Sequence, residues 1–264
     1  MRHRHAVAAL VLLVSLVLAA CAGVAAGAGG VGAAAVYRFG VVGNRGKIAK
    51  LERDKPTLVP GIRGTVVQIA TSNSDGYALT STGAVWAWGV ASYGELGNGK
   101  TPPYSSNAVR VEFPTGVRIV ALANPMPFDG ALAIDSHRQA WGWGLNGDGD
   151  LCLPDLLLLR PRRIPLGDVT LATGARTHSL FDSHGKLYAC GSGDAGELGN
   201  GTTTSSPKPT VVTGLPRAAS VSALTSSWEG SGALLSNGAY YDWATTPPAS
   251  SATAAPPTAP NPSA

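Results

Sequence analysis

The stretch of sequence that decides the fold runs from Leu79 to Gly99 and reads LTSTGAVWAWGVASYGELGNG. Its first part, Ser81-Thr82-Gly83, lies between two runs of β-branched and aromatic residues, which favour strands. Glycine adopts the positive φ that a tight hairpin needs. The last part, Gly94 to Gly99, is a glycine-rich turn motif around Leu96. We therefore expect a β-hairpin followed by a tight turn.

The aromatic motif of this stretch recurs along the chain. Its closing positions are spaced by 49, 55, 47 and 53 residues, and they are Gly40, Gly89, Gly144, Gly191 and Ala244. Independently, Lys55-Pro56-Thr57-Leu58-Val59 returns as Lys208-Pro209-Thr210-Val211-Val212, and this separation equals three periods of about 51 residues. A repeat of this length is typical of propellers and solenoids.

One period contains signals for four short strands, at 66–70, 77–80, 85–88 and 108–111. Four short strands per repeat build one blade of a β-propeller. The hairpin glycine returns as Gly185 and Gly238, but Arg138 takes its place in the third copy. Arginine tolerates positive φ poorly, so this copy predicts a different or strained turn.

The glycine-rich motif also recurs, at 149–152 and 196–201. We expect its leucine to fill the space between neighbouring blades while the glycines let the backbone turn closely around it. The positions to which the repeat assigns a structural role are Trp88, Gly89, Gly94, Leu96, Gly97, Trp143, Gly144, Gly149, Leu151, Gly191, Gly196, Leu198, Gly199 and Trp243.

These motifs together resemble the regulator of chromosome condensation repeat. The resemblance covers residues 36–244 and implies a β-propeller, commonly seven-bladed. Residues 36–244 suffice for about four four-stranded blades, so we expect an all-β, propeller-like array that is incomplete. Three explanations stay open: a truncated reading frame, an open arc completed by another chain, and a small closed propeller. An open arc could self-associate through its sheet edges.

Composition excludes several other classes of protein. Glycine (34 residues) and proline (19 residues) make up 20% of the 264 residues, and only 14% are charged. This composition is unlike that of a coiled coil, a helical bundle or a charged disordered tail. Without Arg2 and Arg4 the formal charge falls from +4 to +2, which predicts no nucleic-acid partner. The basic cluster Arg160, Arg162 and Arg163 is expected in a solvated loop.

The N-terminus predicts export from a bacterial cell. Residues 1–21 read as a signal peptide whose end, Leu18-Ala19-Ala20-Cys21, is similar to a lipobox. Cys21 would then carry the lipid that anchors the protein in the cell membrane. The alternative is ordinary cleavage after Ala20 or Ala28, which would give a secreted protein. Residues 22–35 are expected to form a tether and residues 245–264 a disordered tail.

Two cysteines, Cys152 and Cys190, remain for the folded part. Export would permit a disulfide between them. They stand 38 residues apart, however, and at different positions of the repeat. Two unpaired cysteines are therefore the favoured interpretation.

The sequence offers no convincing active site. Glu95, Asp150 and Glu197 hold equivalent repeat positions and are interpreted as turn residues. The set His178, Asp182 and His184 indicates a metal site only weakly, because a turn intervenes. There is no nucleophile elbow and no phosphate-binding loop. We therefore expect neither catalysis nor a cofactor or metal.

Aromatic residues suggest binding instead. The tryptophans of the strand motif are expected in the core, whereas Tyr93, Tyr104 and Phe128 lie in loops, where propellers bind partners. The favoured function is a non-catalytic binding or scaffold module outside the bacterial membrane, which recognises a protein or glycan through its blade loops. The alternatives are a hydrolase or lyase of cell-wall polymer and a fragment without function. An export signal disfavours the exchange activity on a nuclear GTPase that the family name implies.

Overall fold

The computed structural model describes residues 35–41, 52–216, 220–228, 230–244 and 253–254, and these residues form strands and loops only. The predicted signal peptide, Cys21, the tether apart from Ala35, and most of the predicted tail lie outside the described residues. Within the described part, no helix is long and apolar enough to cross a membrane.

The strands form five antiparallel sheets, which we call blades I to V. Blade I has two strands, β1 (Tyr37–Val41) and β2 (Glu52–Leu58). Blade II contains β3 (Val66–Thr71), β4 (Asp75–Thr80), β5 (Val85–Val90) and β6 (Tyr104–Arg110). Blade III contains β7 (Ile119–Leu122), β8 (Gly130–Asp135), β9 (Ala140–Leu145) and β10 (Leu157–Arg163).

Blades IV and V follow the same order. Blade IV contains β11 (Val169–Gly174), β12 (His178–Ser183), β13 (Lys186–Gly191) and β14 (Ser206–Val211). Blade V contains β15 (Val221–Ser226), β16 (Ser231–Leu235), β17 (Tyr240–Trp243) and β18 (Thr253–Ala254). The prediction of about four four-stranded blades is confirmed.

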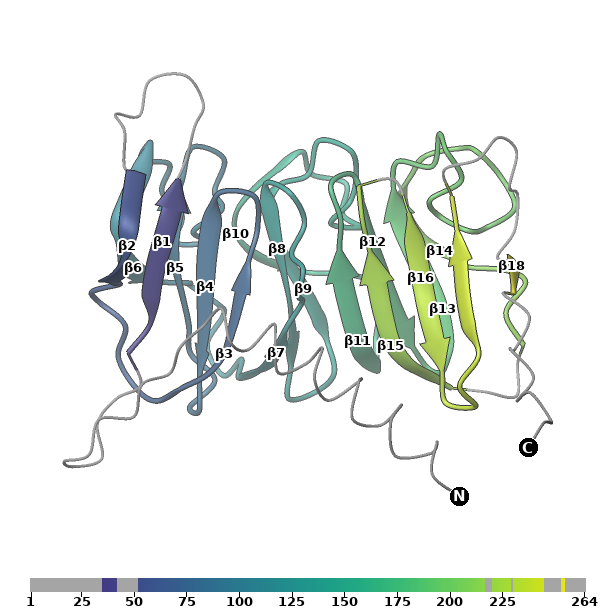
Figure 1. Ribbon diagram of the computed structural model, residues 1–264, viewed down its shortest axis with the longest axis horizontal. Coiled ribbons are helices and arrows are strands. Elements are labelled where there is room, and N and C mark those ends of the chain that lie inside the picture. The colour runs from purple at the N-terminus through teal and green to yellow at the C-terminus, as the bar shows by residue number, and fades with distance from the viewer. Residues whose placement is uncertain (1–34, 42–51, 217–219, 229, 245–252, 255–264) are drawn as a thin grey trace, which may run out of the picture.

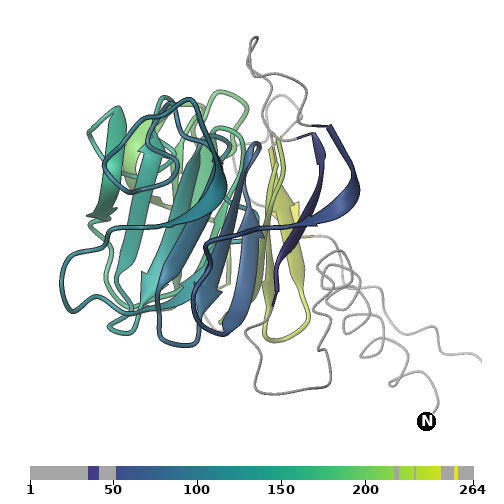
Figure 2. The same ribbon diagram turned by 90° about the vertical axis from the view of Figure 1, so that its left-hand side faces the viewer.

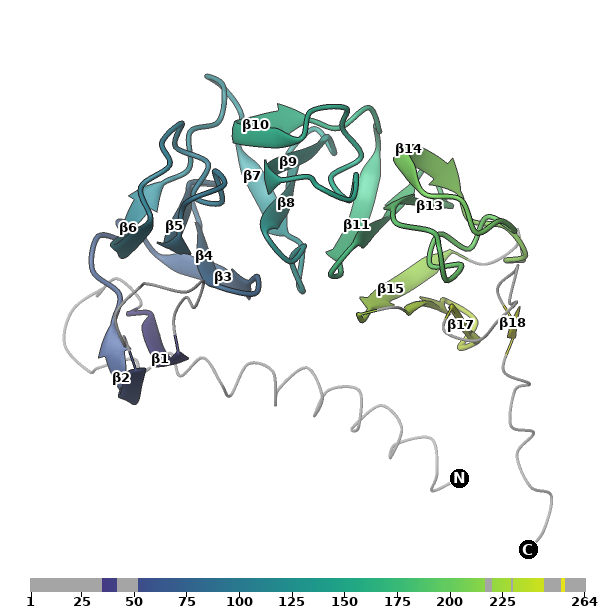
Figure 3. The ribbon, with the colours of Figure 1, turned by 90° about the horizontal axis from the view of Figure 1, so that it is seen from above.

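The blades stand side by side in an open arc, seen from above in Figure 3. The first strand of each four-stranded blade lies on the concave side, and the neighbouring first strands β3 and β7, and β11 and β15, contact each other. Gln68 on β3 joins blades II and III. Its side chain donates to the Leu122 carbonyl at 2.8 Å and accepts from the Leu122 N–H at 2.9 Å. The chain is an incomplete, open propeller.

The two copies of the Lys-Pro-Thr motif occupy corresponding strands, as the period predicts. Leu58 on β2 pairs with Tyr37 of the aromatic motif, and Val211 on β14 pairs with Tyr188 of its later copy. In blade V, Thr253 and Ala254 of the predicted tail pair with β17 and add a fourth strand to the sheet. Two residues of the segment assigned to the tail therefore belong to the last sheet of the array.

The hairpin turns follow the repeat with one exception. Arg138 has φ 58°, and its N–H donates to the Asp135 carbonyl at 2.9 Å, as the N–H of Gly83 does to Thr80. The turn is thus not different, but it holds arginine in a left-handed conformation. The exception is blade IV, where Ser183 pairs with Lys186 across the two-residue turn His184-Gly185.

Neighbouring blades are joined by contacts between the two repeated motifs. The Trp143 Nε1–H of blade III donates to the Glu95 carbonyl of blade II at 2.9 Å, and Trp243 of blade V donates to the Glu197 carbonyl of blade IV at 2.8 Å. A Cβ on Gly97 would lie 2.9 Å from Trp143 Cδ1, so glycine is required beside the indole. Leu96, Leu151 and Leu198 are fully buried, as expected for residues that fill the space between blades.

Cys152 and Cys190 form a disulfide, so the favoured prediction of two unpaired cysteines is wrong. The bond joins the turn of blade III to β13 of blade IV. It occupies the place where the two neighbouring interfaces pack a glycine against a tryptophan. Cys152 has φ 56°, close to the 58° of Gly97 and the 57° of Gly199. The difference in repeat position, which counted against pairing, is what brings the two sulfurs together.

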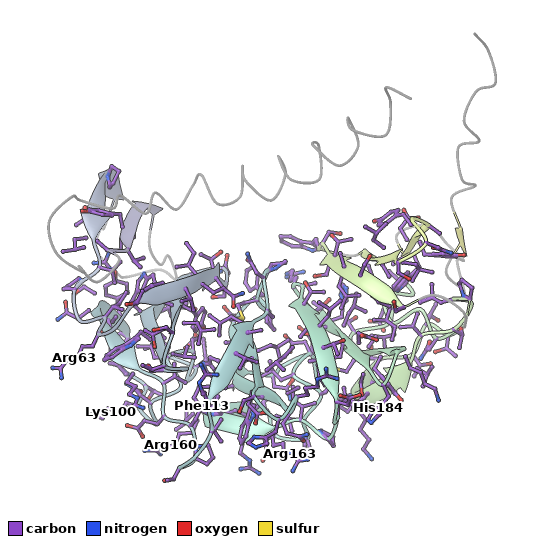
Figure 4. All side chains as sticks on the ribbon, turned by 90° about the horizontal axis from the view of Figure 1, so that it is seen from below. Arg63, Lys100, Phe113, Arg160, Arg163 and His184 are labelled. Atoms are coloured by element: carbon purple, nitrogen blue, oxygen red, sulfur yellow. A yellow bond between two sulfur atoms is a disulfide. The ribbon has the colours of Figure 1, made fainter. Side chains whose placement is uncertain are left out.

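The basic cluster is also placed differently from the prediction. Arg160, Arg162 and Arg163 belong to strand β10, and Figure 4 shows Arg160 and Arg163 on the convex side of the arc. Arg160 pairs with Glu112 at 2.9 Å and Arg162 with Asp155 at 3.7 Å. The cluster is solvated, as expected, but it lies on the outermost strand of its sheet.

Candidate functional site

The strands lie along one common axis and alternate in direction, so the loops gather at two ends of the arc, which Figures 1 and 2 show above and below the sheets. One end carries the short hairpin turns after β4, β8, β12 and β16. The other end, here called the loop end, carries the segments before those strands and the longer connections after β5, β9 and β13. The candidate site lies at the loop end.

The three equivalent carboxylates of the glycine-rich motif are buried at the loop end. Glu95 Oε2 accepts from the Tyr93 N–H at 2.7 Å, and Glu197 Oε2 accepts from the Ala195 N–H at 2.9 Å. These two glutamates thus close their own turns, as the sequence predicted for these positions. They stabilise the motif whose carbonyl receives the next blade's tryptophan.

Asp150, the third member, is one methylene shorter, and no corresponding bond to the Asp148 N–H forms. Its side chain is only 4% exposed. Burial raises the pKa of the Asp150 carboxyl from 3.8 to about 8, opposed by a hydrogen bond from its own N–H. The pKa of the Asp75 carboxyl in blade II is also raised, mainly by burial and secondly by the nearby charge of Glu95.

A cluster of two aromatic rings and one arginine bridges the loops of blades III, IV and V. The Arg176 guanidinium carbon lies 4.3 Å from the centroid of the Trp228 ring and 5.9 Å from that of Phe128. The two rings approach edge to face, with centroids 6.4 Å apart. Trp228 remains 57% exposed and is the largest of the exposed apolar side chains among the described residues.

Two hollows adjoin this cluster and share Arg176 as a wall. The first has a volume of about 200 Å³ and is lined by Phe128, Asp129, Leu145, Gly147, Asp148, Asp150 and Arg176. The second has a volume of about 310 Å³ and is lined by Arg176, Thr177, Ser192, Asp194, Ala195, Glu197 and Trp228. Each hollow therefore combines carboxylates, one aromatic ring and the shared guanidinium.

The three residues weighed as metal ligands do not come together. His178 is buried at the start of β12, with Nε2 2.8 Å from Ser231 Oγ, whereas His184 lies in the turn at the opposite end of that strand. The Asp182 carboxylate accepts a hydrogen bond from Thr170. Among the described residues, no group of three metal-ligating side chains is found.

Of the three loop aromatics expected to meet a partner, only Phe128 belongs to the cluster. Tyr104 begins β6, and its hydroxyl accepts from Arg38 Nη1 at 3.1 Å, which joins blades I and II. Trp228 and Arg176 were not predicted. A signal for Trp228 was present, since it is the one tryptophan of six that falls outside the strand motif.

Comparisons with known proteins agree with the repeat pattern. Residues 184–233 match the family model described as the Regulator of chromosome condensation (RCC1) repeat. The chain is 30% identical over 228 residues to human E3 ubiquitin-protein ligase HERC2, covering 80% of this chain and 5% of that protein. It is 30% identical over 187 residues to the Ultraviolet-B receptor UVR8 of Arabidopsis thaliana, covering 69% of this chain and 41% of that protein.

Solved structures show the same fold. Prp20p of Saccharomyces cerevisiae superposes with a TM-score of 0.68 at 22% identity, over 83% of this chain and 57% of that one. Human WBSCR16 superposes with a TM-score of 0.65 at 22% identity, over 75% of this chain and 53% of that one. The chain thus spans little more than half the length of these two solved propellers and less than half the length of the two sequence relatives. From its recurring motifs, its blades and these matches, the chain belongs to the regulator of chromosome condensation repeat family of β-propellers.

Proposed function

We propose that this protein is a non-catalytic binding module that recognises another protein through the loop end of its propeller arc. The observation that carries the proposal is the exposed cluster of Phe128, Arg176 and Trp228 between two hollows. Tryptophan, exposed here as Trp228, is one of the side chains that most often dominate the binding energy of protein interfaces. A rigid sheet scaffold that presents such loops is the usual architecture of a binding site.

The relatives support a protein partner rather than a reaction. The yeast structure is described by its binding to Gsp1p and histones, and a second structure shows yeast RCC1 bound to Kap60. The ligase activity named for HERC2 belongs to a protein of which this chain matches 5%. A glycan is the second candidate ligand, because the exposed Trp228 ring could stack on a sugar.

The same proposal places the module outside a bacterial cell, held by a lipid on Cys21. The disulfide between Cys152 and Cys190 supports an oxidising compartment, where such bonds persist. Membrane fractionation with a fatty-acid analogue should label the wild type and not Cys21→Ala. Label retained by the variant would contradict the anchor, and a wild-type protein found only in the cytoplasm would contradict export.

Site-specific photo-crosslinking in the native host tests the binding surface. A photoreactive amino acid replaces Asn73 or Asp148 at the loop end, and His137 or Asn237 in the hairpin turns serves as the matched control. We expect a discrete protein adduct from the loop-end positions only. Adducts from the hairpin turns alone, or no loop-end adduct in a folded protein, would contradict the proposal. A glycan ligand would appear as an adduct sensitive to glycosidase rather than to protease.

A further inference from the structure

We propose that the two hollows beside Arg176 are paired subsites for cationic side chains, so that the partner presents an extended basic segment. This inference rests on the proposed function and names the chemistry of its partner. The carboxylates in the lining carry the argument. Asp129, Asp148 and Asp150 line the first hollow, Asp194 and Glu197 line the second, and Arg176 is the only cation in either lining.

Asp150 lines the first hollow, and its carboxyl takes no part in closing the turn of its motif. The side chain is buried, and among the described residues its own N–H is the only hydrogen-bond donor to the carboxyl. Glu95 and Glu197, at the equivalent positions, each use one carboxylate oxygen to accept a hydrogen bond within the turn. A buried carboxyl without a second partner is costly, and an ammonium or guanidinium placed in the hollow would stabilise its charged form.

The aromatic rings beside the hollows already hold one cation. Arg176 already lies against Trp228 and Phe128, and these rings attract a guanidinium through their quadrupoles. No hydrogen bond or ion pair to another described residue restrains the Arg176 guanidinium. The Trp228 ring also lines the second hollow, beside Asp194. A lysine or arginine that enters there would meet the ring and the carboxylates together.

The charge distribution gives the site selectivity. The predicted mature chain has a formal charge of about +2, and Arg160 and Arg163 of β10 lie on the convex side. A basic peptide is therefore repelled weakly by the molecule as a whole and attracted only where carboxylates gather. Hollows with low-dielectric walls concentrate such a local field. A basic peptide is thus expected to bind at the loop end although the chain as a whole is positively charged.

Fluorescence anisotropy of the full chain with a labelled decapeptide of alternating lysine and glycine tests the proposal. We expect saturable binding at low ionic strength that weakens as salt is raised, and no binding of the same peptide with glutamate in place of lysine. Asp148→Asn and Asp194→Asn should each weaken binding about 1.5-fold to fivefold, the usual range for one exposed charge pair. Both side chains are exposed, so the variants should fold, which a melting curve verifies.

Two further variants make the result decisive. Glu112→Gln removes an exposed carboxylate on the convex side and should leave binding unchanged. Arg176→Gln removes the cation shared by the two hollows and should strengthen binding of the lysine peptide severalfold. If the site instead bound anions through Arg176, the same variant would weaken binding. Equal effects of Glu112→Gln and Asp148→Asn, weaker binding by Arg176→Gln, or no binding of the lysine peptide would overturn the proposal. If the loop end still crosslinks a partner in those cases, the proposed function stands and only the cationic chemistry fails.

Discussion

At the scale of single residues, Cys152 and Cys190 exchange one kind of contact between blades for another. In the two neighbouring interfaces, tryptophan Nε1 donates to the carbonyl of Glu95 or Glu197 beside a glycine. In this interface the Cys190 Sγ lies 3.5 Å from the Asp150 carbonyl, in the place of the indole nitrogen. The disulfide is therefore the covalent counterpart of the glycine and tryptophan pair.

This equivalence predicts a rescue experiment. Cys190→Ser should lower the free energy of unfolding by about 2–4 kcal/mol, the usual contribution of a disulfide that closes a loop of this length. The double variant Cys152→Gly with Cys190→Trp should recover a large part of that loss, because it restores the contact of the neighbouring interfaces. Urea unfolding with and without a reductant measures both. Equal stability of Cys190→Ser and the double variant would contradict the equivalence.

The pairing could have been read from the sequence, since the two cysteines occupy the Gly97 and Trp143 positions of consecutive repeats. To recognise the pairing, one must know that those two positions touch across a blade interface. Aligning the chain on itself does not reveal that contact. The turn roles of Glu95 and Glu197 were predictable from local spacing. The hollows were not, because they depend on loops from three blades.

His178 gives stability a defined pH dependence. Burial lowers the pKa of His178 from 6.5 to about 4, and the neutral ring lies beside Ser231 Oγ. A depressed folded-state pKa stabilises the protein above pH 6.5 and loses that contribution as the pH falls toward 4. The wild type should lose up to about 3 kcal/mol of unfolding free energy across this window relative to His178→Gln. Parallel pH profiles of the two proteins in urea unfolding would contradict the assignment.

At the scale of elements, the hairpins show where the repeat constrains the backbone and where it does not. Three turns keep three residues between paired strands, and Arg138 adopts the left-handed conformation that Gly83 and Gly238 adopt. The sequence predicted these strands because β-branched runs and glycines alternate at a fixed period. It did not predict the shorter turn of blade IV, since Ser183-His184-Gly185 reads like its equivalents although β12 and β13 pair one residue out of step.

A pair of variants isolates the strain at Arg138. Arg138→Ala and Arg138→Gly both remove the exposed ion pair with Asp168, but only glycine relieves the positive φ. The glycine variant should therefore be more stable than the alanine variant by about 1 kcal/mol. Thermal or urea unfolding measures the difference. At His137, whose φ is not positive, the same pair should give the opposite order, and an opposite order at Arg138 would contradict the strain.

At the scale of the whole molecule, the open arc determines how stability is distributed. The largest hydrophobic cluster joins blades II, III and IV, a second joins IV and V, and a third joins I and II. Each blade is thus stabilised mainly by its neighbours, as in a linear repeat array. Blades II, III and IV each have a packed neighbour on both sides, whereas blades I and V each have one in the described arc.

Hydrogen exchange resolves this distribution blade by blade. We expect the amides of β8, β9, β12 and β13 to exchange slowest and those of β1, β2, β16 and β17 to exchange orders of magnitude faster, because the outer blades can open while the middle ones stay folded. Mass spectrometry of peptides from each blade gives the rates. Reduction of the disulfide should accelerate exchange in blade IV more than in blade II, since the bond holds the seam between blades III and IV. Uniform protection across all blades would contradict the open arc, because only a closed ring gives every blade two neighbours.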